Sequence, residues 1–226
     1  MSAIETELKS AALQKLNRHS YVGDIVSAVS EIHQKEVNIS IWQRKLNNNI
    51  VKASKHIIKT QPRLQISKVI KPKDVNEILI SEIGSGDDTS DLREDIFDLV
   101  NMFCHLFDLK KVVFGLKVLD HAMCPRFHID RVTCRLITTY QGIATEWLPH
   151  HLVDRSKLGY ASHGKLDEET GIFKNLEDIR NLDAGHVGFL KGESWDGNQG
   201  AGLVHRSPKV ENGRQRLLMT LDFVDM

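Results

Sequence analysis

Apolar residues recur at helical spacing over much of the first half of the chain. In residues 21–36 they fall three and four positions apart, which is the spacing of one face of a helix. The same spacing occurs in 46–59, 73–83 and 92–109. Shorter runs with alternating apolar residues, 37–44 and 63–70, predict two strands between these helices. The first half is therefore predicted to be mainly helical.

The second half has the pattern of strands. Segments rich in β-branched and alternating apolar residues occur at 111–120, 127–140, 185–195, 201–207 and 214–224. Residues 141–184 are rich in Gly, His and charge, which predicts long loops with short strands. This segregation predicts an α+β fold, in which a helical region (1–110) buttresses a β-rich domain (111–226).

The composition narrows the class of function. The 226 residues suffice for one domain with a proper core, and 30 Lys and Arg balance 30 Asp and Glu. Zero net charge and 6% aromatic residues give neither a basic surface nor stacking platforms, so no nucleic-acid partner is expected. The chain has no apolar run of about 18 residues and no apolar leader, so no membrane association and no secretion are expected. Three cysteines without close pairs are typical of a reducing compartment, and the expected location is the cytoplasm.

A candidate metal site begins in the stretch CPRFHIDRVTCRLITTYQGIATEWL, residues 124–148. His128 and Asp130 stand two apart, so on a strand they face the same cavity. His205, in GLVHRSP, lies on another predicted strand. Two histidines and one carboxylate form a facial triad, which leaves coordination positions open and usually holds non-haem Fe(II). His128, Asp130 and His205 are therefore predicted to be the metal ligands and the catalytic centre.

Two arginines open the last predicted strand, in ENGRQRLLMTLDF. A guanidinium can hold a carboxylate through two parallel hydrogen bonds. Arg216 and Arg214 share a strand face, so alternation alone does not decide between them. Tyr140 is even-numbered like His128 and Asp130, so on one regular strand its side chain would face the same side as theirs. Tyr140 is therefore another candidate to bind an acid. Arg135 is odd-numbered, so on one regular strand its side chain is expected to face away from His128 and Asp130, unless a bulge intervenes.

These pieces, in this order, resemble the Fe(II)/2-oxoglutarate-dependent dioxygenase superfamily. HID followed by RLITTYQGIATEW resembles its His-x-Asp strand with the next strand and turn, and LDAGHVGFLKGESW its middle strand. LVHRSPKV resembles the strand of the distal His, and NGRQRLLMTLDF the last strand, so the likeness covers about residues 115–224. The resemblance implies a double-stranded β-helix of jelly-roll or cupin type, with Fe(II) and 2-oxoglutarate as cofactors. It implies that Arg216 anchors the far carboxylate of 2-oxoglutarate, with Arg214 as the runner-up.

Most of the chain also resembles an uncharacterised bacterial family, domain of unknown function 1826. CPRFHID, TYQG, TEWL, GLVHRSP and RLLMTLD carry this likeness, together with VNISIWQR in the first half. One departure is Ala144-Thr145, where proteins of this type often have Gly-Thr before Glu-Trp. The genes of this family can accompany zinc-homeostasis genes, and the family implies little about substrate.

The resemblances together imply an oxygenase, in particular a hydroxylase, that acts on a small molecule or a protein side chain. The alternative is a non-catalytic zinc-binding or metal-homeostasis protein on the same fold, which would add a loop histidine such as His150 or His151 to the triad. The sequence does not indicate an oligomeric state.

The other candidate residues have a simpler structural interpretation. The histidines of the predicted loops are expected to lie at the surface or in a lid; they are His150, His151, His163 and His186. A closed zinc site with Cys124 and Cys134 is disfavoured, because the six residues from His128 to Cys134 span about 20 Å on a strand. Trp147 is expected to fill the mouth of the barrel.

Overall fold

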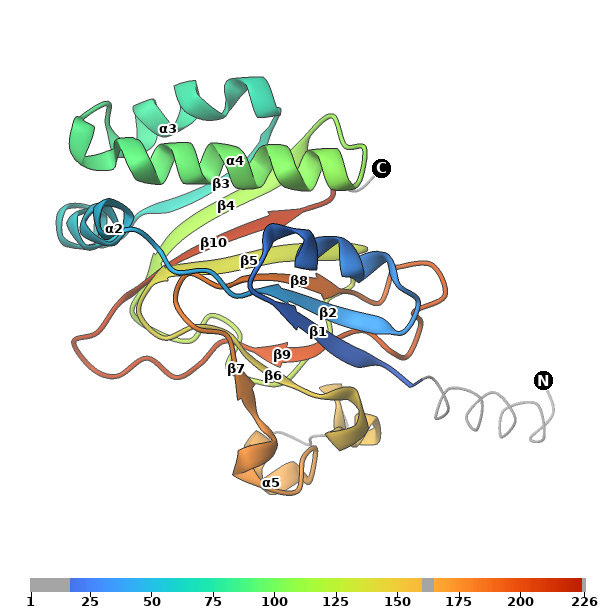
Figure 1. Ribbon diagram of the computed structural model, residues 1–226. Helices are drawn as coiled ribbons and strands as arrows, with labels where there is room; N and C mark the ends of the chain where they lie inside the picture. The colour runs from blue at the N-terminus through green and yellow to red at the C-terminus, as the bar shows by residue number, and fades with distance from the viewer. Residues whose placement is uncertain (1–16, 160–164, 225–226) are drawn as a thin grey trace.

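The computed structural model describes residues 17–159 and 165–224 of the chain. Within these residues two β-sheets pack against each other, and helices cover the outer face of the larger sheet (Figure 1). The strands are β1 (His19–Gly23), β2 (Val37–Trp42), β3 (Gln65–Ile70), β4 (Val112–Leu119), β5 (Cys134–Gln141), β6 (Glu146–Leu148), β7 (Arg180–Asn181), β8 (Val187–Lys191), β9 (Val204–Arg206) and β10 (Arg216–Asp222). The α-helices are α2 (Asn48–Thr60), α3 (Val75–Ile83), α4 (Ser90–Leu106) and α5 (Asp167–Thr170). The 3-10 helices are η1 (Val26–His33), η2 (Pro72–Asp74), η3 (Asp87–Thr89), η4 (His150–Leu152), η5 (Arg155–Lys157) and η7 (Leu176–Asp178).

The larger sheet has the strand order β1-β2-β8-β5-β10-β4-β3, and the smaller sheet has the order β7-β6-β9. Neighbouring strands are antiparallel in both sheets, except for the parallel pair β1 and β2. The mixed α+β class is as predicted. The division of the chain at residue 110 stays a prediction, and strands from both sides of that position share the larger sheet. No helix in the described part of the chain is long and apolar enough to cross a membrane.

The larger sheet has two different faces because side chains alternate along each strand. On β10, Leu217, Met219 and Leu221 point into the core beneath α2, α3 and α4. Phe103 of α4 lies in this core and is fully buried. The alternate residues of β10, which begin with Arg216, face the smaller sheet.

The space between the two sheets is lined mainly by apolar side chains. Leu218 of β10, Ile137 of β5 and Leu190 of β8 pack there against Trp147 of β6 and Leu203, which lies just before β9. This second core holds the smaller sheet against the larger one, and it is next to the predicted metal ligands.

The predicted helices 46–59, 73–83 and 92–109 correspond to α2, α3 and α4. The prediction of a helix over 21–36 is wrong: its first residues form β1, and a 3-10 helix follows. Of the four apolar residues that gave the helical spacing, Val29 and Ile32 are buried, whereas Ile25 and Val26 are exposed. Over two turns, however, a repeat of three residues cannot be told from one of 3.6.

The prediction of one strand over 127–140 is also wrong, because the chain bends at residues 131–133. The carbonyl oxygens of Val132 and Thr133 accept hydrogen bonds from the backbone of Ser194 and Gly192. His128 forms a separate β-bridge with His205 on the smaller sheet, whereas β5 belongs to the larger one. The bend therefore carries the chain from one sheet to the other.

Candidate metal centre

The backbone places His128 beside His205. Each residue donates its N–H to the carbonyl oxygen of the other, at 3.0 Å in both directions. Directly paired residues of antiparallel segments project to the same side, and here the centroids of the two imidazoles are 4.6 Å apart. Val204 packs against the outer face of the smaller sheet, so alternation turns His205 toward the inter-sheet space.

Asp130 completes a group of three possible metal ligands. One nitrogen from each histidine and one oxygen of Asp130 all lie within 4.8 Å of one another, and among the described residues this is the one group of its kind. The Asp130 carboxylate is 3.4 Å from Nε2 of His128 and 3.3 Å from Nε2 of His205. The three residues predicted to be ligands therefore converge.

Carbonyl oxygens fix the orientation of both imidazoles. Nδ1 of His128 lies 2.8 Å from the carbonyl oxygen of Arg126, and Nδ1 of His205 lies 3.3 Å from that of Leu203. A carbonyl oxygen only accepts hydrogen bonds, so each Nδ1 carries a proton and each Nε2 is the nitrogen that faces the site. This is how a metal-binding histidine is normally held by its surroundings.

Arg135 holds the carboxylate of the group. Its Nη1 donates to Asp130 at 2.5 Å, and its Nε and Nη2 donate to Asp222 at 2.8 and 3.0 Å. Burial raises the pKa of Asp130, but the two imidazoles and the guanidinium outweigh burial and hold that pKa well below its ordinary value. Asp130 is therefore an anionic ligand at neutral pH. The expectation that Arg135 faces away from the pair is wrong, because the bend at 131–133 breaks the alternation.

Replacing Arg135 with Gln is expected to weaken divalent-metal binding by about 10–100-fold, as the loss of a partner that orients a ligand usually does. An anaerobic titration with Fe(II), followed by calorimetry, measures the change. Arg131→Gln is the matched control, because Arg131 is exposed and lies in the same bend. Equal affinities in the two variants would show that Arg135 does not orient the ligand.

Arg216 is a buried cation with no counter-ion in the described part of the chain. The residue is 1% exposed, and the one side-chain hydrogen bond that it makes there is long, 3.4 Å from Nη2 to the hydroxyl of Thr139. Nε and Nη1 have no hydrogen-bond partner within the described residues. Burial lowers the pKa of Arg216 to about 10. A buried charged donor left unsatisfied is costly, so this group indicates the place of an anionic ligand.

Trp147 also has an unsatisfied donor in the inter-sheet space. Its ring is 6% exposed, and its indole N–H has no hydrogen-bond partner among the described residues. Trp147 is the register partner of His205 on the neighbouring strand. The sequence favoured packing at the mouth of the barrel for Trp147 over a place beside the site, because the pairing of β6 with β9 could not be read from the sequence.

Two of the candidates for binding an acid lie elsewhere. Tyr140 faces the helices, where its hydroxyl donates to Asp95 of α4 at 2.7 Å, so it does not share a face with the predicted ligands. The bend at 131–133 explains why the prediction for Tyr140 differs from the structure, because the alternation of side chains before the bend does not continue after it. Arg214 is exposed in the turn before β10 and does not share a strand face with Arg216.

The remaining histidines and cysteines do not join the group. Cys134 is buried in the helix-covered core and Cys124 is exposed, so they form no closed zinc site with the histidines. His150 lies 3.0 Å from Arg155, and His186 lies 3.8 Å from Asp183. His163 lies outside the described residues.

Comparison with known proteins gives a family and a fold. The family model described as protein of unknown function (DUF1826) matches residues 23–222. The structure is similar to that of dioxygenase for auxin oxidation 1 from Arabidopsis thaliana in a binary complex with 2-oxoglutarate, with a TM-score of 0.52 and 9% identity over 92% of this chain and 93% of that one. A prolyl-4-hydroxylase of Pseudomonas putida has a TM-score of 0.45 and 12% identity, over 88% of this chain and 98% of that one. No curated protein matches the chain significantly.

Proposed function

Because the chain belongs to the DUF1826 family and its structure is similar to those of Fe(II)/2-oxoglutarate dioxygenases, we propose that it is an Fe(II)- and 2-oxoglutarate-dependent oxygenase, in particular a hydroxylase. On this proposal the two packed sheets are the halves of a double-stranded β-helix. The observation that carries the proposal is Arg216, a buried guanidinium whose Nε and Nη1 are unsatisfied. A site that only stores a metal has no need of a buried cation on the sheet face that is turned toward the metal ligands.

The ligand set fits iron. Two imidazole nitrogens and one ionised carboxylate are the donors of the facial triad that non-haem Fe(II) prefers. The third donor is an anion, which offsets part of the charge of a divalent ion. His128, Asp130 and His205 would hold the metal, and Arg216 the far carboxylate of 2-oxoglutarate.

Bound iron and 2-oxoglutarate would together activate O2 to hydroxylate a C–H bond, with 2-oxoglutarate oxidised to succinate and CO2. The contribution of the chain is positioning and exclusion of water. The carbonyl oxygens beside Nδ1 of His128 and His205 orient the imidazoles, and Arg135 orients Asp130. The apolar residues between the sheets keep water away from the reacting groups.

The substrate is proposed to be a small molecule or a protein side chain. The alternative, a zinc-binding protein of the same fold, needs a fourth ligand to close the site. Among the described residues no fourth His, Cys, Asp or Glu belongs to the group. A group of three ligands within the described residues supports catalysis over storage, because a catalytic centre keeps coordination positions open.

The proposal is tested by adding Fe(II) and then 2-oxoglutarate to the metal-free protein without oxygen. A weak visible charge-transfer band is expected, because the keto acid chelates iron at an open site. Asp130→Ala should give no band. If the wild-type protein gives no band and retains zinc tightly through purification, the metal-binding alternative replaces the oxygenase.

A further inference from the structure

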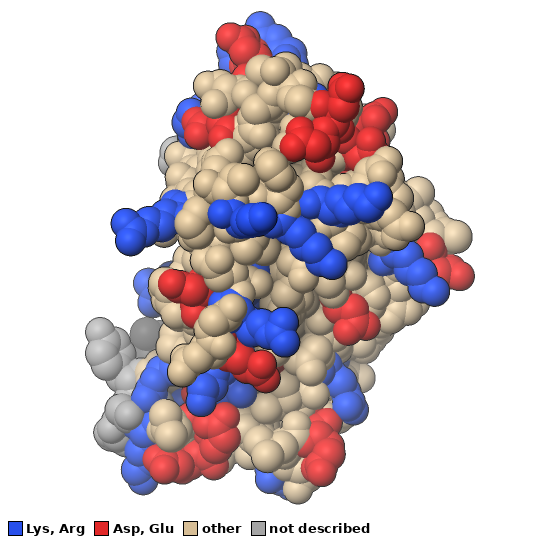
Figure 2. All heavy atoms as spheres, turned by 90° about the vertical axis from the view of Figure 1, so that its left-hand side faces the viewer, with Lys and Arg blue, Asp and Glu red and all other residues tan. Residues whose placement is uncertain are grey.

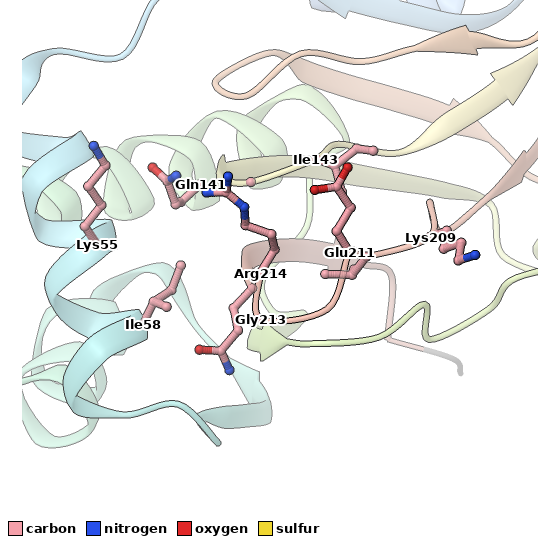
Figure 3. Close-up of a pocket in the computed structure, with 11 residues that line it drawn as sticks. Lys55, Ile58, Gln141, Ile143, Lys209, Glu211, Gly213 and Arg214 are labelled. Carbon is pink, nitrogen blue, oxygen red and sulfur yellow. The ribbon is translucent and has the colours of Figure 1, made fainter.

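A second concave site lies away from the metal centre, between α2 and the two loops that flank β5 and β10. Its volume is about 530 Å³, which is within the range of small-molecule sites. Its lining includes Lys55 and Ile58 of α2, Gln141 and Ile143 at the end of β5, and Arg214 in the loop before β10 (Figure 3).

The charges of this pocket are not balanced. Lys55 and Arg214 have no side-chain hydrogen bond or ion pair within the described residues, whereas Arg44 and Arg206 each pair with carboxylates. The Arg214 guanidinium is directed toward the side of the pocket where Gln141 and Lys55 lie (Figure 3). Two cations and an amide therefore offer donors to an anion.

The other charged residues of the lining do not cancel this charge. Glu211 is the one acid among the residues that line the pocket, and its carboxylate lies toward Ile143 (Figure 3). Lys209 adds a third cation to the lining, although its ammonium group points away from the others. On this side of the molecule, Lys and Arg side chains form a band with acidic side chains above and below it (Figure 2).

The pocket also offers an apolar surface. Ile58, Ile143 and Val210 line it, and Ile143 is 47% exposed. A ligand that covers Ile143 while it reaches the two cations must combine an apolar body with an anionic group.

We propose that this pocket binds a small organic anion, with a carboxylate or phosphate group held by Lys55 and Arg214 and an apolar body against Ile58 and Ile143. The proposal does not depend on the oxygenase assignment. The ligand would touch the loop that joins His205 to Arg216. Gly142, in the wall of the pocket, packs so closely that a Cβ would come within 3.0 Å of the Arg216 backbone. A ligand bound in the pocket would therefore lie next to Arg216, the first residue of β10.

The test is calorimetric titration of the full-length protein with benzoate, phenyl phosphate and the neutral benzyl alcohol. At least one anion is expected to bind with a Kd below about 1 mM, and benzyl alcohol is expected not to bind. Whichever anion binds more tightly identifies the head group. The double variant Lys55→Glu, Arg214→Glu should weaken that binding more than tenfold.

Lys52→Glu is the matched control, because Lys52 is exposed on the same helix and does not line the pocket. Thermal unfolding checks that each variant is folded. The proposal fails if neither anion binds or if the double variant binds as the wild type does. It also fails if Arg216→Ala alone abolishes binding, because the anion would then occupy the space between the sheets.

Discussion

Replacing Arg216 with Ala is expected to abolish measurable binding of 2-oxoglutarate while Fe(II) still binds. Removing one partner of a buried pair of charges costs roughly 2–5 kcal/mol, which is about 30- to several-thousand-fold in affinity. The loss should fall at the high end of this range, because the Arg216 guanidinium is buried, where the loss of a charged partner costs most. The metal ligands are on other elements, so their geometry should persist.

The measurement is the visible band of the complex of protein, Fe(II) and 2-oxoglutarate, titrated without oxygen, with metal content determined separately. Arg214→Ala is the matched control, since Arg214 lies two positions away and is exposed. A normal band in Arg216→Ala together with a lost band in Arg214→Ala would make Arg214 the anchor. Unchanged affinity in both variants would count against 2-oxoglutarate as the co-substrate.

The sequence predicted α2, α3 and α4 and several of the strands, because those segments bury one face. The apolar spacing of 92–109 corresponds to α4, whose buried residues include Ile96 and Phe103. The alternating run in 214–224 corresponds to β10. The spacing of His128, Asp130 and His205 predicted a shared site, and the three side chains do converge.

Details that depend on the path of the backbone could not be predicted in this way. Residues 127–140 look like one strand, because each part alternates. Only the hydrogen bonds from the backbone of Gly192 and Ser194 reveal the bend at 131–133. A single break in alternation reverses every later assignment of faces. This is why Arg135 contacts Asp130, whereas Tyr140 lies on the opposite face of β5 and contacts Asp95.

The unsatisfied N–H groups of Trp147 and Arg216 in the inter-sheet space could not be predicted from the sequence for a different reason. Whether a polar group is satisfied depends on all of its neighbours in three dimensions. Trp147 in the sequence is typical of a core residue, and its indole N–H has no partner only because the surrounding positions of both sheets are apolar. The same holds for Arg216, for which the sequence suggested a role but not its burial.

Replacing Asp130 with Ala is expected to abolish Fe(II) binding, with a larger effect than any change of a residue that only orients a ligand. Such orienting residues account for about 10–100-fold in metal affinity. Asp130 is itself one of three donors and the one anion among them. Its loss leaves two imidazoles, with ring centroids 4.6 Å apart, beside the Arg135 guanidinium, and that positive charge opposes the binding of a cation.

His205→Ala should have an effect of the same size, because His205 is 5% exposed and water cannot readily replace its imidazole. His186→Ala is the control, since His186 is outside the group. Anaerobic calorimetry with Fe(II), repeated with Zn(II), should show one binding event in the control and none in the two triad variants. If Asp130→Ala retains tight Zn(II), the ion is held by other ligands and the three-ligand centre is not the metal site. Loss of both metals instead shows that one centre accepts either ion. In that case the choice between iron and zinc follows from the metal supply of the cell, because divalent zinc binds such donors more tightly than iron.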